Sequence, residues 1–330
     1  MTSERSALRN RIEWMGLHAA LAPLRVMPTR WLAPSMTALS RLGCALAVGR
    51  RRQAVQLVRD RLGLPEREAR RVVRASFETM LLNLVDSTIL ERRLQAGTPL
   101  AELVQVEGGE HLRAALASGR GVLLCTAHFG AWEALGLVMH GLFEPAWAVV
   151  RDLDNPLLEP VATGHRMRYT RGGISKDGGG LKLARALRAG QSVIALIDQN
   201  AGSSGVILDF LGAPSSHHMV AGHFAVRQGA LALPVYLSRL PGKPAYRLVI
   251  EAPVEPTPGL DEAAAAVDVT RRISASLAAR VRADPGQWLW LHDRWRHAQR
   301  ELRRQARAAA GEPVADGRTA VATAQGTNGT

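Results

Sequence analysis

The segment that decides this fold is TAHFGAWE, residues 126–133, because it joins a strand-like run to a helical pattern. The run before it, Gly121–Cys125, is almost continuously apolar, and apolar side chains recur at helical spacing after it. Positions five apart point away from each other on one helix, so we place His128 in the turn and Glu133 in the first helical turn. The pattern predicts that His128 is a general base oriented by Glu133. The ordinary alternative is a core histidine beside a surface carboxylate.

Further motifs follow along the chain. Residues 151–158 read RDLDNPLL, and the pair Arg166 and Arg168 comes next. An apolar run then ends in IDQ, residues 197–199, and PGQWLWLHDRWR occupies residues 285–296. Asp198 therefore ends a predicted strand, which is where α/β sheets place functional groups. A helix cap is the alternative role for such an aspartate.

Taken with His-x4-Glu, these motifs resemble the late lipid A acyltransferases of bacteria, the lauroyl and myristoyl transferases of the wider lysophospholipid and glycerolipid acyltransferase superfamily. The resemblance covers roughly residues 100–297. It implies an O-acyltransferase that moves a fatty acyl chain from an acyl thioester, on acyl carrier protein or CoA, to a hydroxyl of a lipid A precursor or related glycolipid. It also implies that Arg166, or alternatively Arg168, binds an anionic part of a substrate and that Asp198 holds Arg166 in position.

The chain departs from the family pattern at several positions. Ala131 stands in place of the usual asparagine, Gly286 and Asp293 replace a glutamate and a basic residue, and residues 215–218 are atypical. These differences leave the acceptor open, and a phospholipid or another glycolipid is the alternative substrate. Acyl-chain length also stays open, because the depth of a pocket built from distant residues sets it.

Composition favours anionic partners. The 330 residues carry a net charge of +13, and the basic side chains are arginines except Lys176, Lys182 and Lys243. Such a surface attracts phospholipid headgroups, acidic carrier proteins and nucleic acid. Two cysteines suggest no disulfide framework. No metal or cofactor is expected, since His217, His218 and His223 lack accompanying carboxylate or cysteine ligands.

The N-terminal region alternates apolar segments with arginines. Between Ile12 and Gly49, stretches rich in Trp and Leu are separated by Arg25, Arg30 and Arg41. No run reaches the ~18 uncharged apolar residues of a spanning helix. Helices of this kind lie in the headgroup layer of an anionic membrane, and the alternative is a helix pair packed on the main domain. The family resemblance favours the first, with a peripheral or monotopic position on the cytoplasmic side of the inner membrane.

The overall pattern predicts an α/β fold in which helices flank a mixed central sheet. Residues 1–100 form a helical membrane-associating region, residues 101–300 the acyltransferase domain and residues 301–330 a disordered tail. Strands are predicted at residues 122–126, 147–151, 192–198, 232–238 and 246–251. Helices are predicted at residues 110–117, 131–140, 181–189, 218–228 and 261–283, and an amphipathic helix after Pro65 should bury Val72, Val73, Phe77, Met80, Leu81 and Leu84.

Other chemistries find little support in the sequence. The glycines at residues 178–180 lack the spacing of a dinucleotide fingerprint, and no phosphate-binding loop or Gly-x-Ser-x-Gly elbow is present. Nucleic-acid binding lacks a reader motif and an aromatic platform, so no nucleic-acid partner is expected. A non-catalytic membrane-surface adaptor is the remaining alternative, and the intact pair His128 and Glu133 argues against it.

Overall fold

A computed structural model describes residues 4–151, 155, 157, 164, 167–242 and 245–309 of the chain. Its centre is a seven-stranded sheet in the order β1-β9-β8-β2-β5-β3-β4. The strands are β1 (Val104–Glu107), β2 (Val122–Thr126), β3 (Trp147–Val150), β4 (Gly172–Ser175), β5 (Ser192–Leu196), β8 (Leu231–Arg239) and β9 (Tyr246–Ile250). All neighbouring pairs are parallel except β8 and β9. The predicted mixed central sheet is confirmed.

The register of the two central strands fixes where the loops meet. β2 and β5 run parallel, with Thr126 opposite Leu196 at their carboxyl ends. The segments that leave these two strands therefore start from the same edge of the sheet. Residues 127–133 and 197–199 are consequently brought together, although they are far apart in the sequence.

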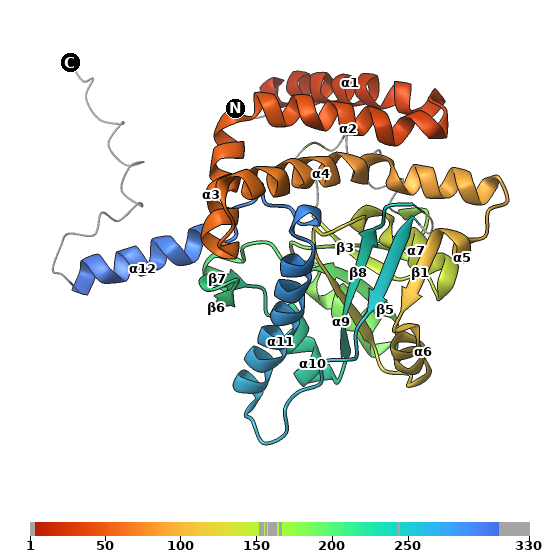
Figure 1. The fold of residues 1–330 in the computed structure, drawn as a ribbon. Coiled ribbons are helices and arrows are strands. Elements are labelled where there is room, and N and C mark those ends of the chain that lie inside the picture. Colours follow the sequence, from red (N-terminus) through yellow and green to blue (C-terminus); the bar gives the residue numbers. More distant parts are fainter. Residues whose placement is uncertain are drawn as a thin grey trace, which may run out of the picture.

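Helices cover both faces of the sheet, and the side chains of β2 alternate between them (Figure 1). Val122 and Leu124 pack with α6 (Gly109–Ala117) and α7 (Leu135–Leu142). Leu123 and Cys125 pack on the opposite face. The helices there are α9 (Gly180–Arg188), α10 (Val220–Gln228) and α11 (Glu262–Ala283). β2 is buried along its whole length, as an apolar parallel strand requires.

Four helices precede the sheet and form a layer along one side of it (Figure 1). They are α1 (Glu4–Val26), α2 (Thr29–Leu46), α3 (Val48–Leu62) and α4 (Glu66–Gln95), and a short α5 (Leu100–Leu103) leads into β1. α4 is the inner helix, and its buried face is partly polar rather than wholly apolar. Leu84, which the sequence pattern placed on the buried side, is exposed, whereas Asn83 and Asp86 are buried.

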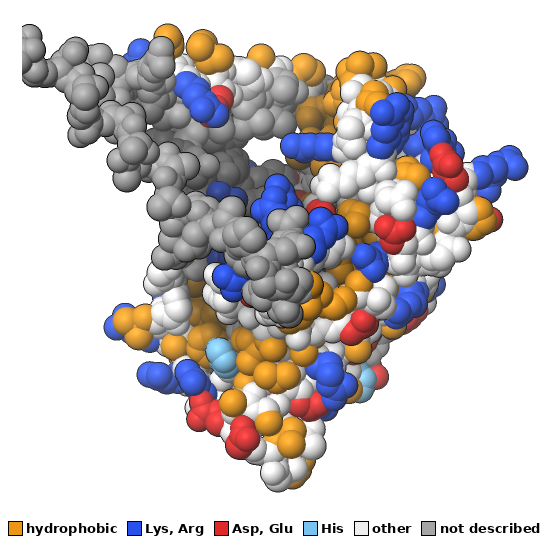
Figure 2. Space-filling view, turned by 90° about the vertical axis from the view of Figure 1, so that its left-hand side faces the viewer, with side chains coloured by type: hydrophobic (Ala, Val, Ile, Leu, Met, Phe, Trp, Pro, Cys, Tyr) orange, Lys and Arg blue, Asp and Glu red, His pale blue; other side chains and the backbone are white. Residues whose placement is uncertain are grey.

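α2 has one packed side and one exposed side. Leu32 and Met36 are buried with Val85 of α4, while Trp31 and Leu42 are exposed. Figure 2 shows hydrophobic and basic side chains along the upper edge of the molecule, where α1 and α2 lie. In the described part of the chain, no single helix is long and apolar enough to cross a bilayer. The pair α2 and α3 reaches that length and hydropathy together, but the chain bends by 93° where they meet.

Several elements differ from the sequence expectations. The hairpin of β6 (Val206–Phe210) and β7 (Ala213–His217) was not predicted, nor were the four-residue strands β1 and β4. The helix expected at residues 131–140 begins instead as a 3-10 turn, η1 (Trp132–Ala134), and two more such turns are η2 (Gly202–Ser204) and η3 (Pro285–Gln287). The prediction that residues 301–330 are disordered is wrong for residues 301–309, because α12 (Arg296–Ala309) is helical. Residues 310–330 lie outside the described residues.

Gly130 is required by the turn after β2. Its φ is +61°, and a Cβ there would stand 2.1 Å from the carbonyl oxygen of Leu237. We expect Gly130→Ala to lower the free energy of unfolding by about 3 kcal/mol, through left-handed strain plus this clash. Gly212→Ala is the matched control, because Gly212 has φ +79° and open space around it. Urea denaturation that gives equal losses for both variants would contradict this assignment.

Candidate active site

The turn that carries His128 is held by backbone contacts on both sides. Phe129 forms an isolated antiparallel bridge with Trp288, and the backbone N–H of Leu289 donates to the His128 carbonyl at 3.1 Å. The N–H of Gly130 donates to the carbonyl of Gln287 at 2.9 Å. The C-terminal tryptophan motif therefore pairs with the turn like a short extra strand. This pairing fixes the backbone from which the imidazole projects.

The imidazole of His128 is held by the carboxylate of Asp198. Nδ1 of His128 lies 2.8 Å from Oδ1 of Asp198, and the His128 backbone N–H donates to Oδ2 at 3.0 Å. Burial alone would raise the pKa of Asp198, but the His128 ring, Arg294 and the Trp288 N–H outweigh it and bring the pKa to about 2. An ionised carboxylate only accepts hydrogen bonds, so Nδ1 carries the proton. In the neutral ring, Nε2 is then the nitrogen without a proton.

Asp198 contacts the His128 ring although 70 residues separate the two in the sequence. The reason is topological: Asp198 follows β5, whose end lies beside the end of β2, so its short side chain reaches the ring directly. Glu133 lies in η1, where its Oε1 accepts a hydrogen bond from the indole N–H of Trp132 at 3.3 Å. Trp132 in turn lies edge-on to the His128 ring, with centroids 5.3 Å apart. His128 and Glu133 line the same pocket.

Trp288 and Arg294 complete the surroundings of Asp198. The indole N–H of Trp288 donates to Oδ2 of Asp198 at 2.9 Å, and Trp288 is 1% exposed. Arg294, which is fully buried, donates to the Ile197 carbonyl and to Nδ1 of His217. Burial lowers the pKa of Arg294 to about 10 and the pKa of His217 to about 3, so at neutral pH the arginine is charged and the histidine neutral. This positive charge helps to keep Asp198 ionised.

Replacing Trp288 tests whether its N–H acts through Asp198. We expect Trp288→Phe to lower kcat about tenfold and to move the acid limb of the pH profile of kcat/KM to higher pH. The reason is that an Asp198 carboxylate with one donor fewer attracts the protonated imidazole more strongly. The matched control is Trp290→Phe, because the Trp290 N–H donates to the Pro285 carbonyl instead. Identical pH profiles for wild type and both variants would show that Trp288 only packs.

Polar side chains of α4 hold the other side of the turn. The Asn83 amide donates to the Gly130 carbonyl at 2.8 Å and accepts from the Glu133 backbone N–H at 3.1 Å. Asp86 forms a buried ion pair with Arg239, which also donates to the Gly130 carbonyl at 3.1 Å. These residues lie outside the sequence motifs that predicted the site. Their signal was polar side chains at helical spacing on the inner face of α4, at Ser76, Thr79, Asn83 and Asp86.

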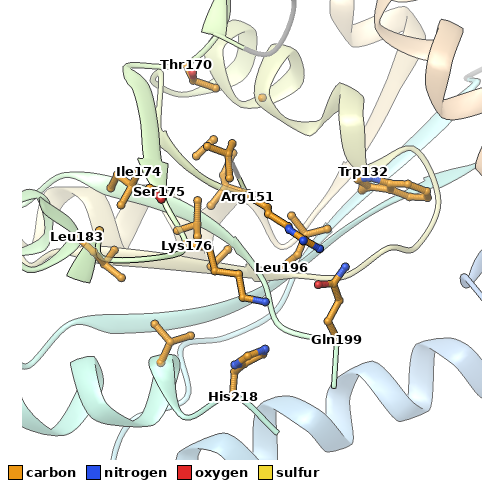
Figure 3. A pocket seen from close by; sticks show the side chains of 18 of the residues that line it. Trp132, Arg151, Thr170, Ile174, Ser175, Lys176, Leu183, Leu196, Gln199 and His218 are labelled. Carbon is orange, nitrogen blue, oxygen red and sulfur yellow. The ribbon is translucent and has the colours of Figure 1, made fainter. Parts of the chain in front are cut away.

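His128 lines a pocket of about 600 Å³ that extends across the carboxyl ends of β2, β3 and β5. Figure 3 shows Arg151, Lys176, Gln199 and His218 directed toward its interior. Much of the remaining wall is apolar, from Leu137, Val149, Ile174, Leu183, Ile194, Leu196, Met219, Val220 and Phe224. A pocket of this kind can take a long apolar chain together with a polar head.

The structure describes only one of the two arginines, Arg166 and Arg168, that were predicted to bind an anionic group. Arg166 lies outside the described residues, and so does its expected pairing with Asp198. Arg168 pairs with Glu91 of α4 and is not among the described residues that line the pocket. Of the RDLDNPLL motif, Arg151 lines the pocket, while the Asn155 amide donates to the Asn10 carbonyl at 2.9 Å. Asn155 therefore joins the motif to α1.

Comparison with known proteins identifies the family of this chain. The model of the family described as bacterial lipid A biosynthesis acyltransferase matches residues 1–297. The chain is similar to the lipid A biosynthesis lauroyltransferase of Escherichia coli (strain K12), at 28% identity over 78% of this chain and 84% of the relative. It is also similar to that organism's lipid A biosynthesis palmitoleoyltransferase, at 32% identity over 58% of this chain and 61% of the relative.

A third relative is named for a different substrate. The phosphatidylinositol mannoside acyltransferase of Mycobacterium tuberculosis (strain ATCC 25618 / H37Rv) is 28% identical over 62% of this chain and 64% of its own length. All three relatives are acyltransferases, and the family model spans nine tenths of the sequence. The chain is therefore an O-acyltransferase that belongs to the bacterial lipid A biosynthesis acyltransferase family.

Proposed function

We propose that this protein transfers a fatty acyl chain from an acyl thioester to a hydroxyl of a lipid A precursor or a related glycolipid, with Nε2 of His128 as the general base. The observation that carries the proposal is the 2.8 Å contact between His128 Nδ1 and the buried, ionised Asp198. That contact leaves Nε2 as the proton acceptor of a ring that lines the pocket. The donor is acyl carrier protein or CoA.

The proposed reaction needs no acyl-enzyme. Nε2 removes the proton of the acceptor hydroxyl while the hydroxyl oxygen attacks the thioester carbonyl carbon. The tetrahedral intermediate collapses, the carbon–sulfur bond breaks, and the leaving thiolate takes the proton from the imidazolium. Asp198 keeps the ring in the Nδ1–H tautomer and stabilises the imidazolium. Glu133, on the same pocket wall, contributes a second negative charge toward it.

The acyl chain would lie along the apolar wall of the pocket. Leu137 and Ile194 belong to the core on one face of the sheet, and Ile174 and Leu183 belong to the core on the other. Burying methylene groups against such side chains contributes about 0.8 kcal/mol for each group. This wall supports a long-chain acyl donor over a short one.

A second acceptor class is favoured by one comparison. Similarity to a phosphatidylinositol mannoside acyltransferase supports a mannosylated phospholipid as the alternative acceptor. Both acceptor classes present sugar hydroxyls near a phosphate, so the chemistry at His128 would be the same.

We further propose a peripheral position on an anionic inner-membrane surface, with the N-terminal helices in contact with lipid. Trp31, Leu39, Leu42 and Leu46 of α2 are exposed although they are large and apolar. Arginines accompany them, and the chain carries a net charge of +13. Exposed apolar side chains with nearby arginines are typical of helices that lie in the headgroup layer. A lipid acceptor could then reach the pocket without leaving the membrane surface.

The test is acyl transfer by the purified full-length protein, followed by mass spectrometry. Each of two donors, an acyl carrier protein thioester and a CoA thioester with the same chain, is offered with a lipid A precursor and with a phosphatidylinositol mannoside. We expect one acceptor to gain the mass of a single ester-linked acyl group. Formation of the ester by a His128→Ala variant at the wild-type rate would refute the role of this histidine.

A further inference from the structure

The pocket contains a group of polar side chains that the proposed base chemistry does not use. Lys176 follows β4, His218 follows β7 and Gln199 follows the β5 end, yet all three line the pocket. Figure 3 shows their polar ends directed toward one another, with Arg151 on the neighbouring wall. Three segments that are distant in the sequence thus present hydrogen-bond donors to one volume.

Two of these donors have no acceptor in the part of the protein that the structure describes. Among the described residues, Lys176 forms no ion pair, not even with Asp177, which also lines the pocket. Nε2 of His218 is buried and has no hydrogen-bond partner within the same described part of the chain. A buried donor without an acceptor is energetically unfavourable, and this applies to Nε2 of His218, whereas Lys176 is exposed to solvent. The buried His218 donor therefore remains unsatisfied until a ligand supplies an acceptor oxygen.

Electrostatics indicate the sign of the missing group. Burial lowers the pKa of His218 to about 4, and the nearby positive charges of Lys176 and Arg294 contribute to that shift. His218 is then a neutral donor beside a cationic one. α10 begins at Val220, and Met219 and Val220 line the pocket, so a helix N-terminus adds partial positive charge. Each of these features favours an anion.

We infer that Lys176, His218 and Gln199 form a subsite for a phosphate group of a substrate. A phosphate ester offers several oxygens, so it can accept hydrogen bonds from donors that approach from different segments. Arg151 borders the same volume and adds charge. The inference rests on the proposed function for its ligand, since both substrates of that reaction carry phosphate: the donor on its phosphopantetheine arm and the acceptor on its glycolipid headgroup.

Binding is measured without turnover, by NMR titration of the full-length protein at constant salt. The probes are 4′-phosphopantetheine against pantetheine, and glucosamine 1-phosphate against glucosamine. The variant is Lys176→Met, which keeps the aliphatic stem and removes the charge. The matched control is Lys182→Met, because Lys182 donates to the Gly173 carbonyl at 2.8 Å and is not among the described pocket residues.

We expect at least one phosphorylated probe to bind more tightly than its unphosphorylated partner. Lys176→Met should weaken that binding roughly tenfold or more, and Lys182→Met should change it less than twofold. The probe that responds identifies the donor or the acceptor as the source of the phosphate. Equal affinity for wild type and Lys176→Met, or no preference for either phosphorylated probe, overturns the subsite even if acyl transfer is intact. Conversely, Lys176-dependent binding supports it even if the proposed acyl transfer fails.

Discussion

His128→Ala is expected to reduce kcat/KM for acyl transfer by about a thousandfold. A positioned general base typically contributes ~10² to 10⁴ in rate, and alanine removes the proton acceptor Nε2 outright. The measurement is the initial rate of ester formation by purified wild type and variant with the same donor and acceptor. The side chain of His128 is only 18% exposed, so thermal unfolding must be recorded for both proteins to separate lost chemistry from lost structure.

The matched control for that variant is His223→Ala. His223 lies in α10, is exposed and is not among the described residues of the pocket, so its removal should leave the rate unchanged. A His128→Ala protein that keeps its melting temperature and more than a tenth of the wild-type rate would contradict the general-base role.

Asp198→Asn is the second change with a large expected effect. The side chain keeps its size, but an amide can present an N–H to Nδ1, which favours the wrong ring tautomer. The equivalent change in a Ser-His-Asp triad lowers kcat by roughly 10⁴, and we expect a loss of about 10³ or more here. Initial rates over a range of pH would measure the loss.

Glu133→Gln is the comparison that makes this prediction decisive. If Asp198 orients the ring, Glu133→Gln should cost no more than about tenfold, because it removes a second negative charge but leaves the His128–Asp198 contact in place. If Glu133→Gln silences the protein while Asp198→Asn remains active, the ring is oriented by Glu133, as the sequence pattern alone suggested. The two variants therefore distinguish between two assignments of one role.

Local periodicity was sufficient to predict the central strands. β2 was predicted at its observed bounds, and β5, β8 and β9 within two residues at each end, since each is an apolar run between turn residues. β1 and β4 were missed because at most two of their four residues are large and apolar, whereas β3, which has the same length, is apolar throughout. Gly172 and Gly173 also weaken the strand signal of β4.

Two residues of the candidate site could be selected from the sequence, but their contacts could not. His128 and Asp198 could be selected because each follows a strand, yet their direct contact depends on β2 and β5 being neighbours in the sheet. The contacts of Trp288 with Asp198 and of Asn83 with Gly130 join segments that are remote in sequence. No periodicity in one segment carries information about a partner in another. The donation from the Trp288 indole to the Asp198 carboxylate is one such contact.

The most direct test of the account is mass spectrometry of total lipids from cells that lack this protein and are complemented with wild type or His128→Ala at equal expression. We predict that wild type restores a glycolipid carrying one additional ester-linked acyl group and that His128→Ala does not. The account would be contradicted if the His128→Ala cells contained that acylated glycolipid at the wild-type level.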